Sequence, residues 1–416
     1  MRLWDAIVVG GGPAGAATAI TLGECGLSVV LLDACAFPRS KPCGDAVSPG
    51  AIPLLEELGV WEAVAGVSTS IDGWRIQSPN GTAFDTLFDL HRQGTPPRGL
   101  CIDRLLFDDI LLDEARSRGV MVRERVRVFR LLRHGGRVVG VKARGPGGEE
   151  IEIAGRFVVG ADGLRSRVAR ELGGVRAGRR RRLGVVGRWM GVRTAAPGTD
   201  PGGESRGELR VTSDGVLGFA PLRCGAANVT LVVPLACAKA LAPDPLPFFM
   251  DRLETWDLAE RLAGAALSRP LDVTGPFEVL PARRSAPGAI LVGDAAGYFD
   301  PFTGQGVFRA LHGARLAAAV VRAALASPGD EPAALRAYGR AMARRLPLSR
   351  AVQHGIDAVV SRPRRFDATA CRLRGRSRLT SLLADITGDR IGSRGPAIGG
   401  PAIGGMAIGG GRRAHA

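Results

Sequence analysis

The chain has 416 residues, of which 45% are hydrophobic and 23% charged, which is ordinary for a globular protein of two or three domains. No apolar run approaches the ~18 residues of a membrane-spanning helix, and the first strand begins too early to leave room for a signal peptide. We therefore expect an intracellular, cytoplasmic protein. Seven scattered cysteines without a CxxC pair, and only five histidines, predict neither a disulfide framework nor a metal site.

The net charge of +16 is concentrated towards the C-terminus. Residues 340–416 contain 15 Arg and four acids, a surplus of 11 positive charges. Nucleic acid, an anionic membrane or an acidic partner could bind such a region. Because no nucleic-acid motif or aromatic interleaving accompanies the charge, we expect no nucleic-acid partner. A solvated Arg-rich surface is the preferred interpretation, and peripheral membrane contact stays open.

The first 33 residues predict a βαβ unit. An apolar strand at Leu3–Val9 precedes Gly10–Gly15, which has the pattern G-x-G-x-x-G, and a small-residue helix follows at Ala16–Cys25. A second strand at residues 28–32 ends at Asp33. Such a unit binds a dinucleotide, and by itself it does not separate NAD from FAD.

Each glycine of this turn has a physical reason. Gly10 permits the tight turn, Gly12 lets a pyrophosphate approach the backbone, and Gly15 lets helix and strand pack closely. Asp33 at the end of the second strand would accept hydrogen bonds from ribose hydroxyls. Together with the strand and helix, these residues predict the pyrophosphate and ribose ends of a dinucleotide site.

Loop and helix signals follow. A Pro- and Gly-rich loop after Asp33 leads to Ser48-Pro49, which predicts the start of a helix that ends near Gly59. Residues 71–88 predict a hairpin, and residues 101–119 a helix that Asp103 caps. The region up to Gly119 therefore combines an α/β start with an inserted hairpin.

The central part of the chain is rich in strands. Residues 120–153 predict a three-stranded meander, followed by a strand that leads into Gly160-Ala161-Asp162-Gly163 and a helix at residues 164–172. Residues 183–280 predict further strands, the last of them at residues 273–280, and a helix at residues 245–264. This part therefore predicts a second, sheet-based domain.

A second Gly-rich turn begins at Gly293, in the sequence GDAAGYFDPFTGQGVFRA. It follows an apolar strand at residues 289–292 and runs into a helix at residues 307–326. Asp294 and the turn Thr303–Gly306 lie between them. Because backbone N–H groups at a helix N-terminus are free and the helix dipole is positive there, the turn can stabilise an anion or electron-rich ring atoms.

The three glycine–acid motifs at Gly10, Gly160 and Gly293 are far more specific together than singly. With them the chain resembles the FAD-dependent aromatic-hydroxylase superfamily over about residues 3–360. Within it, the segment Lys41–Pro49 is similar to the geranylgeranyl-reductase branch. The resemblance implies FAD as the cofactor, with NAD(P)H as a transient electron donor because no second nucleotide-binding unit is visible.

The resemblance also implies roles for individual residues. Asp33 would bind the adenosine ribose, Asp294 the ribityl chain, and the turn 301–306 would face the pyrimidine end of the isoalloxazine ring. Cys43 and Gly44 would lie near the ring on the substrate side, as candidate catalytic residues. The residues assigned to FAD binding are Gly10, Gly12, Pro13, Ala14, Gly15, Asp33, Arg104, Val126, Asp162, Gly163, Gly293, Asp294, Pro301, Gly304, Gln305 and Gly306.

Simpler interpretations stay open for some of them. Cys43 can be a passive small residue, Arg104 a surface arginine and Asp162 an ordinary turn residue. Val126 can be plain strand core, because its expected contact with the adenine uses only backbone.

The expected fold is α/β, with a Rossmann-like FAD-binding domain, an inserted mixed β-sheet substrate domain and C-terminal helices. We assign residues 1–70, 100–182 and 281–330 to the first and residues 71–99 and 183–280 to the second. Residues 331–390 form the helical segment, and residues 391–416 a disordered Gly-rich tail that repeats a five-residue unit.

The expected activity is that of an FAD-dependent oxidoreductase. The first hypothesis is reduction of a carbon–carbon double bond in a lipophilic, isoprenoid-type substrate, which the loop around Cys43 favours. The alternative is a monooxygenase that hydroxylates or epoxidises an aromatic or polyketide-like substrate. Val216–Pro221 favours this alternative, because it stands where the reductase branch has a Y-x-W-x-F-P box and contains neither Tyr nor Trp.

Two other hypotheses are weaker. A flavin halogenase is disfavoured by the same missing aromatic residues at Val216–Pro221. The other is a non-catalytic module of a different class, in which FAD is only structural and the Arg-rich region docks the protein on a membrane.

Overall fold

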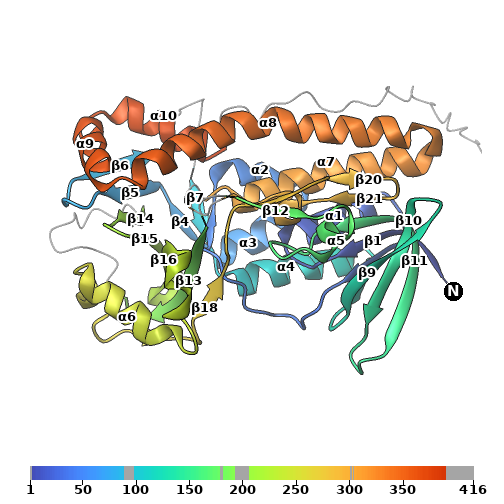
Figure 1. Cartoon of the computed structure of the whole chain (residues 1–416), viewed down its shortest axis with the longest axis horizontal. Coiled ribbons are helices and arrows are strands. Elements are labelled where there is room, and N and C mark those ends of the chain that lie inside the picture. Colours follow the sequence, from blue (N-terminus) through green and yellow to red (C-terminus); the bar gives the residue numbers. More distant parts are fainter. Residues whose placement is uncertain are drawn as a thin grey trace, which may run out of the picture.

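The computed structural model of the chain describes residues 2–88, 98–178, 181–192, 206–299, 302 and 304–389, with backbone alone at residues 344–353 and 357. Within these residues the architecture is mixed α/β, with two eight-stranded sheets side by side and helices packed on them (Figure 1). The predicted fold class is confirmed. The predicted tail at residues 391–416 lies outside the described residues, as does Pro301.

The first sheet has a parallel centre. The strand order is β20-β21-β11-β1-β2-β8, and β9 and β10 extend β11 as an antiparallel meander. Its strands are β1 (Leu3–Val9), β2 (Val29–Leu32), β8 (Met121–Arg123), β9 (Arg127–His134), β10 (Arg137–Arg144), β11 (Glu150–Gly160), β20 (Ser285–Ala286) and β21 (Ala289–Leu291).

Register explains why three distant motifs meet. Val9 is paired with Leu32 and with Gly160, and Gly160 is paired with Leu291. The carboxyl ends of four parallel strands therefore lie in one row, which is where ligands bind in open α/β sheets. Each motif begins at one of these ends or within two residues of it.

Both faces of this sheet are buried. Ala6 and Val8 belong to one core with the helices, whereas Ile7 and Val9 belong to a second core with the meander. A parallel strand covered on both faces carries an unbroken apolar run, as residues 6–9 of β1 do. The helices of the first core are α1 (Pro13–Glu24), α2 (Ile52–Glu57), α3 (Trp61–Val67), α4 (Arg104–Ser117), α7 (Gly306–Ala326) and, through Leu335 and Tyr338, α8 (Glu331–Val360).

The second sheet is mixed, with the order β17-β13-β16-β15-β14-β5-β6, and β18 pairs with β13. The β14–β5 pair is parallel and the other pairs are antiparallel. Its strands are β5 (Gly73–Gln77), β6 (Ala83–Leu87), β13 (Arg182–Met190), β14 (Arg206–Val211), β15 (Val216–Pro221), β16 (Ala226–Pro234), β17 (Ala266–Leu267) and β18 (Asp272–Thr274). Helix α6 (Pro245–Thr255) covers one face through an apolar core.

Smaller elements join the two sheets. Strands β3 (Ala46–Val47), β4 (Thr69–Ile71) and β7 (Gly99–Cys101) form a three-stranded sheet, and β12 (Val175–Ala177) pairs with β19 (Val279–Pro281). Helix α5 (Arg167–Glu171) follows the motif at Gly160. None of the described helices combines the length and the apolar character needed to cross a bilayer.

The C-terminal part is a layer of three helices, α8 (Glu331–Val360), α9 (Pro363–Leu373) and α10 (Ser377–Thr387). In Figure 1, α8 runs along α7 across the top of the molecule, and α9 and α10 lie over β5 and β6. This layer therefore spans both sheets.

Some element boundaries differ from the sequence prediction. The helical segment expected from residue 331 begins with one continuous helix of 30 residues, α8, which packs along α7. The predicted helix at residues 245–264 ends at Thr255. The predicted strand at residues 273–280 divides into β18 and β19, which pair with different partners.

Candidate active site

A cavity of about 1010 Å³ opens at the row of strand ends and continues between the second sheet and helices α8–α10. This volume is at the upper end of the range for small-molecule and cofactor sites. The predicted site residues that line it are Gly10, Gly12, Pro13, Ala14, Asp33, Cys43, Gly44, Arg104, Val126, Asp162, Gly163, Gly293, Asp294, Gly304 and Gly306. Gly15 and Gln305 lie behind its wall, and Pro301 is outside the described residues.

Two glycines of the first turn, Gly10 and Gly15, have no room for a side chain, whereas Gly12 is open. Gly10 has φ +105°, and a Cβ atom on it would lie 2.5 Å from the Ala161 carbonyl oxygen. A Cβ atom on Gly15 would lie 1.8 Å from the Gly10 carbonyl oxygen, so Gly15 allows helix α1 to approach β1. At Gly12 the nearest atoms are the guanidinium nitrogens of Arg39 and Arg104, at 3.7 and 3.9 Å from such a Cβ. The backbone at Gly12 is therefore open to the cavity and flanked by two cations.

Asp33 is held by the backbone around it. Its Oδ2 accepts a hydrogen bond from the Gly11 N–H (2.7 Å) and its Oδ1 from the Cys35 N–H (2.8 Å), which leaves lone pairs on both oxygens. The Val126 N–H donates to the Asp33 carbonyl at 2.8 Å. Any contact of Val126 with an adenine would therefore use its carbonyl.

Arg104 is buried at the start of α4, which excludes its interpretation as a surface residue. It donates two hydrogen bonds to Asp108, at 2.6 and 2.8 Å, and Arg39 forms a further ion pair with Asp108 at 3.2 Å. Arg39 also lies 3.5 Å from Asp33. These buried pairs hold two guanidinium groups at the cavity wall beside the first glycine turn.

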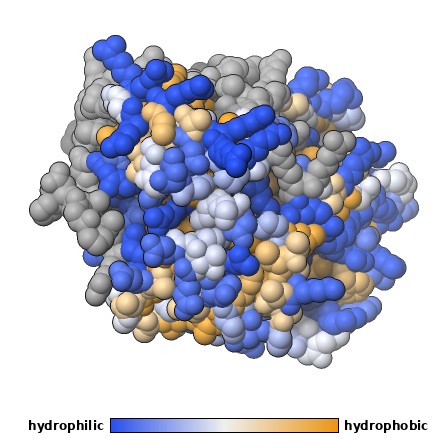
Figure 2. All heavy atoms as spheres, turned by 60° about the vertical axis from the view of Figure 1, so that its left-hand side comes forward, coloured by the Kyte–Doolittle hydropathy of each residue, from blue (hydrophilic) through white to orange (hydrophobic). Residues whose placement is uncertain are grey.

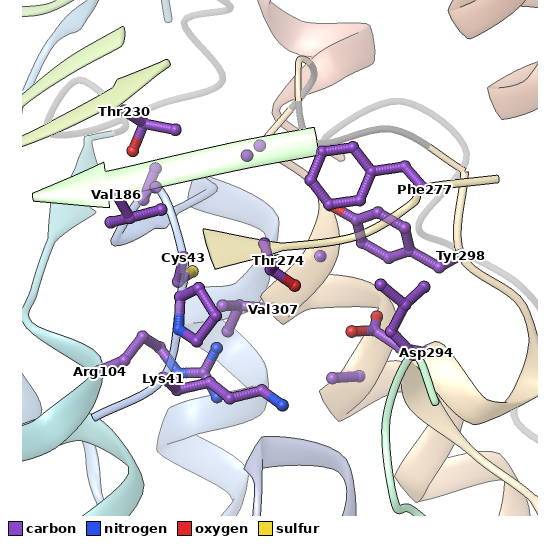
Figure 3. A pocket seen from close by; sticks show the side chains of 18 of the residues that line it. Lys41, Cys43, Arg104, Val186, Thr230, Thr274, Phe277, Asp294, Tyr298 and Val307 are labelled. Carbon is purple, nitrogen blue, oxygen red and sulfur yellow. The ribbon is translucent and has the colours of Figure 1, made fainter. Parts of the chain in front are cut away.

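Lys41 and Asp294 bring opposite charges into the centre of the cavity. In Figure 3 the Lys41 side chain extends along the cavity toward the side where Asp294 lies. Burial lowers the pKa of Lys41, and Arg39 and Arg104 lower it further. Burial raises the pKa of Asp294, while Lys41 opposes that rise. No ion pair joins Lys41 to an acid among the described residues, so its ammonium group has hydrogen-bonding capacity left for a ligand.

Cys43 faces the cavity from the loop after Asp33 (Figure 3). Burial raises the pKa of its thiol, and the nearby Arg104 opposes this effect. Its carbonyl accepts a hydrogen bond of 2.7 Å from the side chain of Asn228, on β16. The thiol is therefore kept protonated near neutral pH, and the second sheet helps to place it.

A buried ion pair fixes the same loop. Asp45, which has φ +54°, accepts hydrogen bonds from Arg188 at 2.8 and 2.9 Å and from Asn228 at 2.7 Å. Burial raises the pKa of Asp45 to about 6, against the lowering effect of Arg188. Arg188 lies on β13 and also forms an ion pair with Asp103 at 3.1 Å. The loop with Cys43 is thus tied to the second sheet and to the start of α4.

Asp162 has a structural role at the start of α5. Its carboxylate accepts hydrogen bonds from the Ser166 hydroxyl (2.5 Å), the Arg167 N–H (2.6 Å) and the Val168 N–H (3.1 Å). These contacts stabilise the first turn of that helix. Asp162 also lines the cavity, where any ligand contact would share an already occupied carboxylate.

The second glycine turn leads into α7. Gly304 has φ +66° and lines the cavity, and Gly306 is the first residue of the helix. Gln305 points away, and its side-chain amide donates to Asp389 Oδ1 at 2.7 Å. The Ser48 hydroxyl donates to Asp389 Oδ2 at 3.0 Å. One carboxylate after α10 therefore braces both the start of α7 and the helix that follows the Cys43 loop.

The remaining part of the cavity is apolar. It continues from Cys43 across the face of the second sheet, where Figure 3 shows Val186, Thr230 and Phe277. The Phe277 and Tyr298 rings pack 5.4 Å apart. The other apolar residues that line this part are Trp74, Ile76, Phe84, Leu209, Val216, Phe219, Val232, Phe302, Ile356, Val359, Val360, Phe366, Leu373 and Leu383.

Several of these contributions were missed in the sequence. Lys41 begins the segment that carried the family resemblance and Arg39 lies two residues before it, but neither was given a role. Asp108 follows Arg104 at i+4, the spacing of a helical ion pair, and this signal was available. Asp389 carried no signal, because its partners Ser48 and Gln305 are 341 and 84 positions away in the chain.

The donor set fits an FAD molecule. An open backbone at a helix start with two guanidinium groups beside it suits a pyrophosphate, an acid after β2 suits a ribose, and a second helix start suits an electron-rich ring. The family of FAD-binding domains has a sequence profile that matches residues 4–352. The chain therefore belongs to this family, and it is an FAD-dependent oxidoreductase.

Particular relatives refine this class. The chain is 29% identical over 373 residues to the digeranylgeranylglycerophospholipid reductase of Methanothrix thermoacetophila. The aligned region covers 83% of this chain and 86% of that protein. It is 31% identical over 323 residues to the menaquinone reductase of Mycobacterium tuberculosis, covering 76% of this chain and 75% of that protein. The expected membership in the FAD-dependent superfamily and the resemblance to its geranylgeranyl-reductase branch are confirmed.

A solved structure supports the fold. The flavin-dependent brominase Bmp2 superposes with a TM-score of 0.79 at 19% identity, over 94% of this chain and 96% of that chain. At this identity the likeness concerns the fold alone.

Proposed function

We propose that the protein reduces a carbon–carbon double bond of a lipophilic, isoprenoid-type substrate. The observation that carries the proposal is the cavity itself, in which a charged part that suits FAD continues past Cys43 into a long apolar part. The names of the two relatives support it, since one is a reductase of digeranylgeranylglycerophospholipid and the other a reductase of menaquinone.

The charged part would hold the cofactor, which supplies the hydride. Gly10, Gly12, Pro13, Ala14 and Arg104 would contact its pyrophosphate region. Asp33 and the Val126 carbonyl would hold the adenosine end. The residues proposed for the ribityl and ring end are Asp162, Gly163, Gly293, Asp294, Pro301, Gly304 and Gly306. Gly15 and Gln305 would act indirectly, because they support this wall without facing the cavity.

Cys43 would supply the proton. Reduction adds a hydride to one carbon of the double bond and a proton to the other. Burial raises the pKa of the Cys43 thiol, which favours a proton donor over a thiolate nucleophile. The thiolate left behind would take a proton from water. Gly44 would leave space beside the thiol for the substrate, because a Cβ atom at this position would meet nothing within 4 Å beyond its chain neighbours.

The apolar part would hold the substrate, and its width is set by small residues. Val216, Gly218 and Ala220 alternate along β15 and therefore share one face of the sheet, and all three line the cavity. A Cβ atom on Gly218 would come no closer than 3.5 Å to any atom beyond its chain neighbours, so the space in front of it is open. These are the positions at which the reductase branch has aromatic residues. The substrate would therefore be bulky at this point.

The electron donor would be NADH or NADPH, bound transiently. Oxidation rates for each, measured without substrate by the loss of nicotinamide absorbance, test this part. If neither NADH nor NADPH is oxidised, a protein electron donor would be the source of the electrons.

A single turnover without oxygen tests the proposed reaction. The purified enzyme is reduced with dithionite under anaerobic conditions and mixed with a prenylated lipid, and the product is analysed by mass spectrometry. We expect a product heavier by two hydrogen atoms. A product that forms only in the presence of oxygen and contains an oxygen atom from it would establish the monooxygenase instead.

Cys43→Ala and Cys43→Ser sharpen the test. We expect Cys43→Ala to lower the anaerobic reduction rate by about 10²-fold or more, the range for loss of a general acid, while FAD content is unchanged. Cys43→Ser, which keeps a donor of similar size, should retain more activity. Equal rates in all three proteins would show that Cys43 only fills space.

A further inference from the structure

The outer surface of α9 and α10 is strongly basic. Arginines at seven positions in residues 361–389 are exposed, and none of the three acids in this segment is. No ion pair joins these arginines to an acid among the described residues. They are Arg362, Arg364, Arg365, Arg372, Arg374, Arg376 and Arg378.

Two large apolar side chains interrupt this basic surface. Leu379 and Leu382 are 41% and 44% exposed, and their i, i+3 spacing places them on one side of α10. Figure 2 turns this side of the molecule forward and shows small hydrophobic spots among hydrophilic residues on its upper part. Exposed leucines among arginines match an anionic bilayer, which offers both phosphate groups and acyl chains. A nucleic acid offers little to an aliphatic side chain.

The inner surface of the same two helices lines the cavity. Phe366, Thr369 and Leu373 of α9 face it, as do Leu383 and Ala384 of α10. A membrane bound to the outside of α9–α10 would therefore lie one helix layer from the site of the lipophilic substrate.

We propose that the α9–α10 surface docks the protein on an anionic membrane, from which its lipophilic substrate is taken. This proposal rests on the proposed function only in naming a lipophilic substrate; the docking itself does not depend on the reaction. It can be measured without turnover, so its failure would leave the proposed reduction untouched, and the reverse also holds.

Vesicle flotation of the full-length, FAD-loaded protein tests the docking. One set of vesicles contains phosphatidylcholine alone, and the other contains phosphatidylcholine with phosphatidylglycerol. We expect binding to the second set that weakens as salt is raised. Equal binding to both sets, or binding to a DNA or RNA duplex with none to the vesicles, would overturn the proposal.

Matched variants locate the surface. Replacing Arg372, Arg374, Arg376 and Arg378 by Gln should weaken vesicle binding by at least about tenfold. The control variant replaces four exposed arginines outside α9 and α10, on β8, β9, α5 and β12, which also make no ion pair with described residues, and should bind as the parent does. Those four are Arg123, Arg130, Arg170 and Arg176.

Two further changes separate the contributions. The double variant Leu379→Gln, Leu382→Gln should weaken vesicle binding less than the arginine variant does. The vesicle binding that remains should be more sensitive to salt. Removal of residues 391–416 should preserve most of the binding. If the truncated protein loses it, or if the arginine variant and its control behave alike, the α9–α10 surface is not the docking site. FAD absorbance of each variant confirms that it is folded.

Discussion

The two parts of the cavity are built in opposite ways. The part proposed for FAD, called here the cofactor part, uses backbone amides, glycines and buried ion pairs such as Arg104–Asp108, all gathered where four parallel strands end. The part proposed for the substrate, called here the substrate part, uses apolar side chains from a second sheet and from helices near the C-terminus, such as Phe84 and Phe366. The first part allows almost no change in shape, because backbone atoms are in contact there. The second part can change size with single side chains.

The largest expected effect is on the tight packing of the cofactor part. In Gly15→Ala the new Cβ would lie 1.8 Å from the Gly10 carbonyl oxygen, so helix α1 must move away from β1. We expect a loss of more than about 4 kcal/mol in the free energy of unfolding, among the largest single-residue effects, and loss of bound FAD.

Urea unfolding and the FAD absorbance spectrum measure this effect. Gly66→Ala is the matched control, because a Cβ atom at this position of helix α3 would meet nothing within 4 Å beyond its own helix. It should leave stability unchanged or slightly raised. Similar losses of stability in both variants would show that the cofactor part is no more tightly packed than the rest of the chain.

The next effect concerns Asp45, where the two parts are joined. Its pKa is about 6 in the folded protein, above the ~3.9 of an unfolded chain, so the folded state binds the proton more tightly. Stability from this group is present at low pH and is lost as pH rises through about 6. By linkage the change is about 3 kcal/mol.

Asp45→Asn removes this titration. The stability of the parent minus that of Asp45→Asn should fall by about 2 kcal/mol between about pH 4 and about pH 7, the larger part of the total change, as measured by urea unfolding. A difference that stays constant over this range would show that Asp45 remains ionised beside Arg188 throughout.

A smaller effect is expected at Asp389, which braces both parts from behind. Asp389→Ala leaves the Ser48 hydroxyl and the Gln305 amide without their carboxylate partner. We expect a loss of about 2 kcal/mol. Asp389→Asn keeps one acceptor oxygen and should lose less; equal losses would indicate that the two hydrogen bonds contribute nothing specific.

The smallest effect should come from the adaptable part. Gly218→Trp adds an indole ring where the nearest atom to its Cβ, Leu209 Cδ2, is 3.5 Å away. The backbone can accept it, so FAD content and stability should stay unchanged, while KM for a bulky lipophilic substrate should rise by about tenfold, or about 1.4 kcal/mol. Steady-state kinetics measure it. An unchanged KM would place the substrate elsewhere.

Predictability from sequence follows the same division. The strand and helix around Gly10, and the motif at Gly293, could be predicted because each depends on a few neighbouring residues. The partners of Cys43 and Asp45 could not, because Asn228 and Arg188 come from strands of another sheet. The hydrogen bonds that Asp162 makes to the first turn of α5 depend on a local geometry that its sequence neighbours do not reveal.

The hydrogen bond between Ser48 and Asp389 joins residues 341 positions apart. During synthesis the first glycine turn, β1 and β2 leave the ribosome early, whereas the segment that completes the cavity wall emerges near the end. The first glycine turn is therefore synthesised long before the wall around the cavity can close. The order of translation makes enclosure of the site a late event in the assembly of this protein.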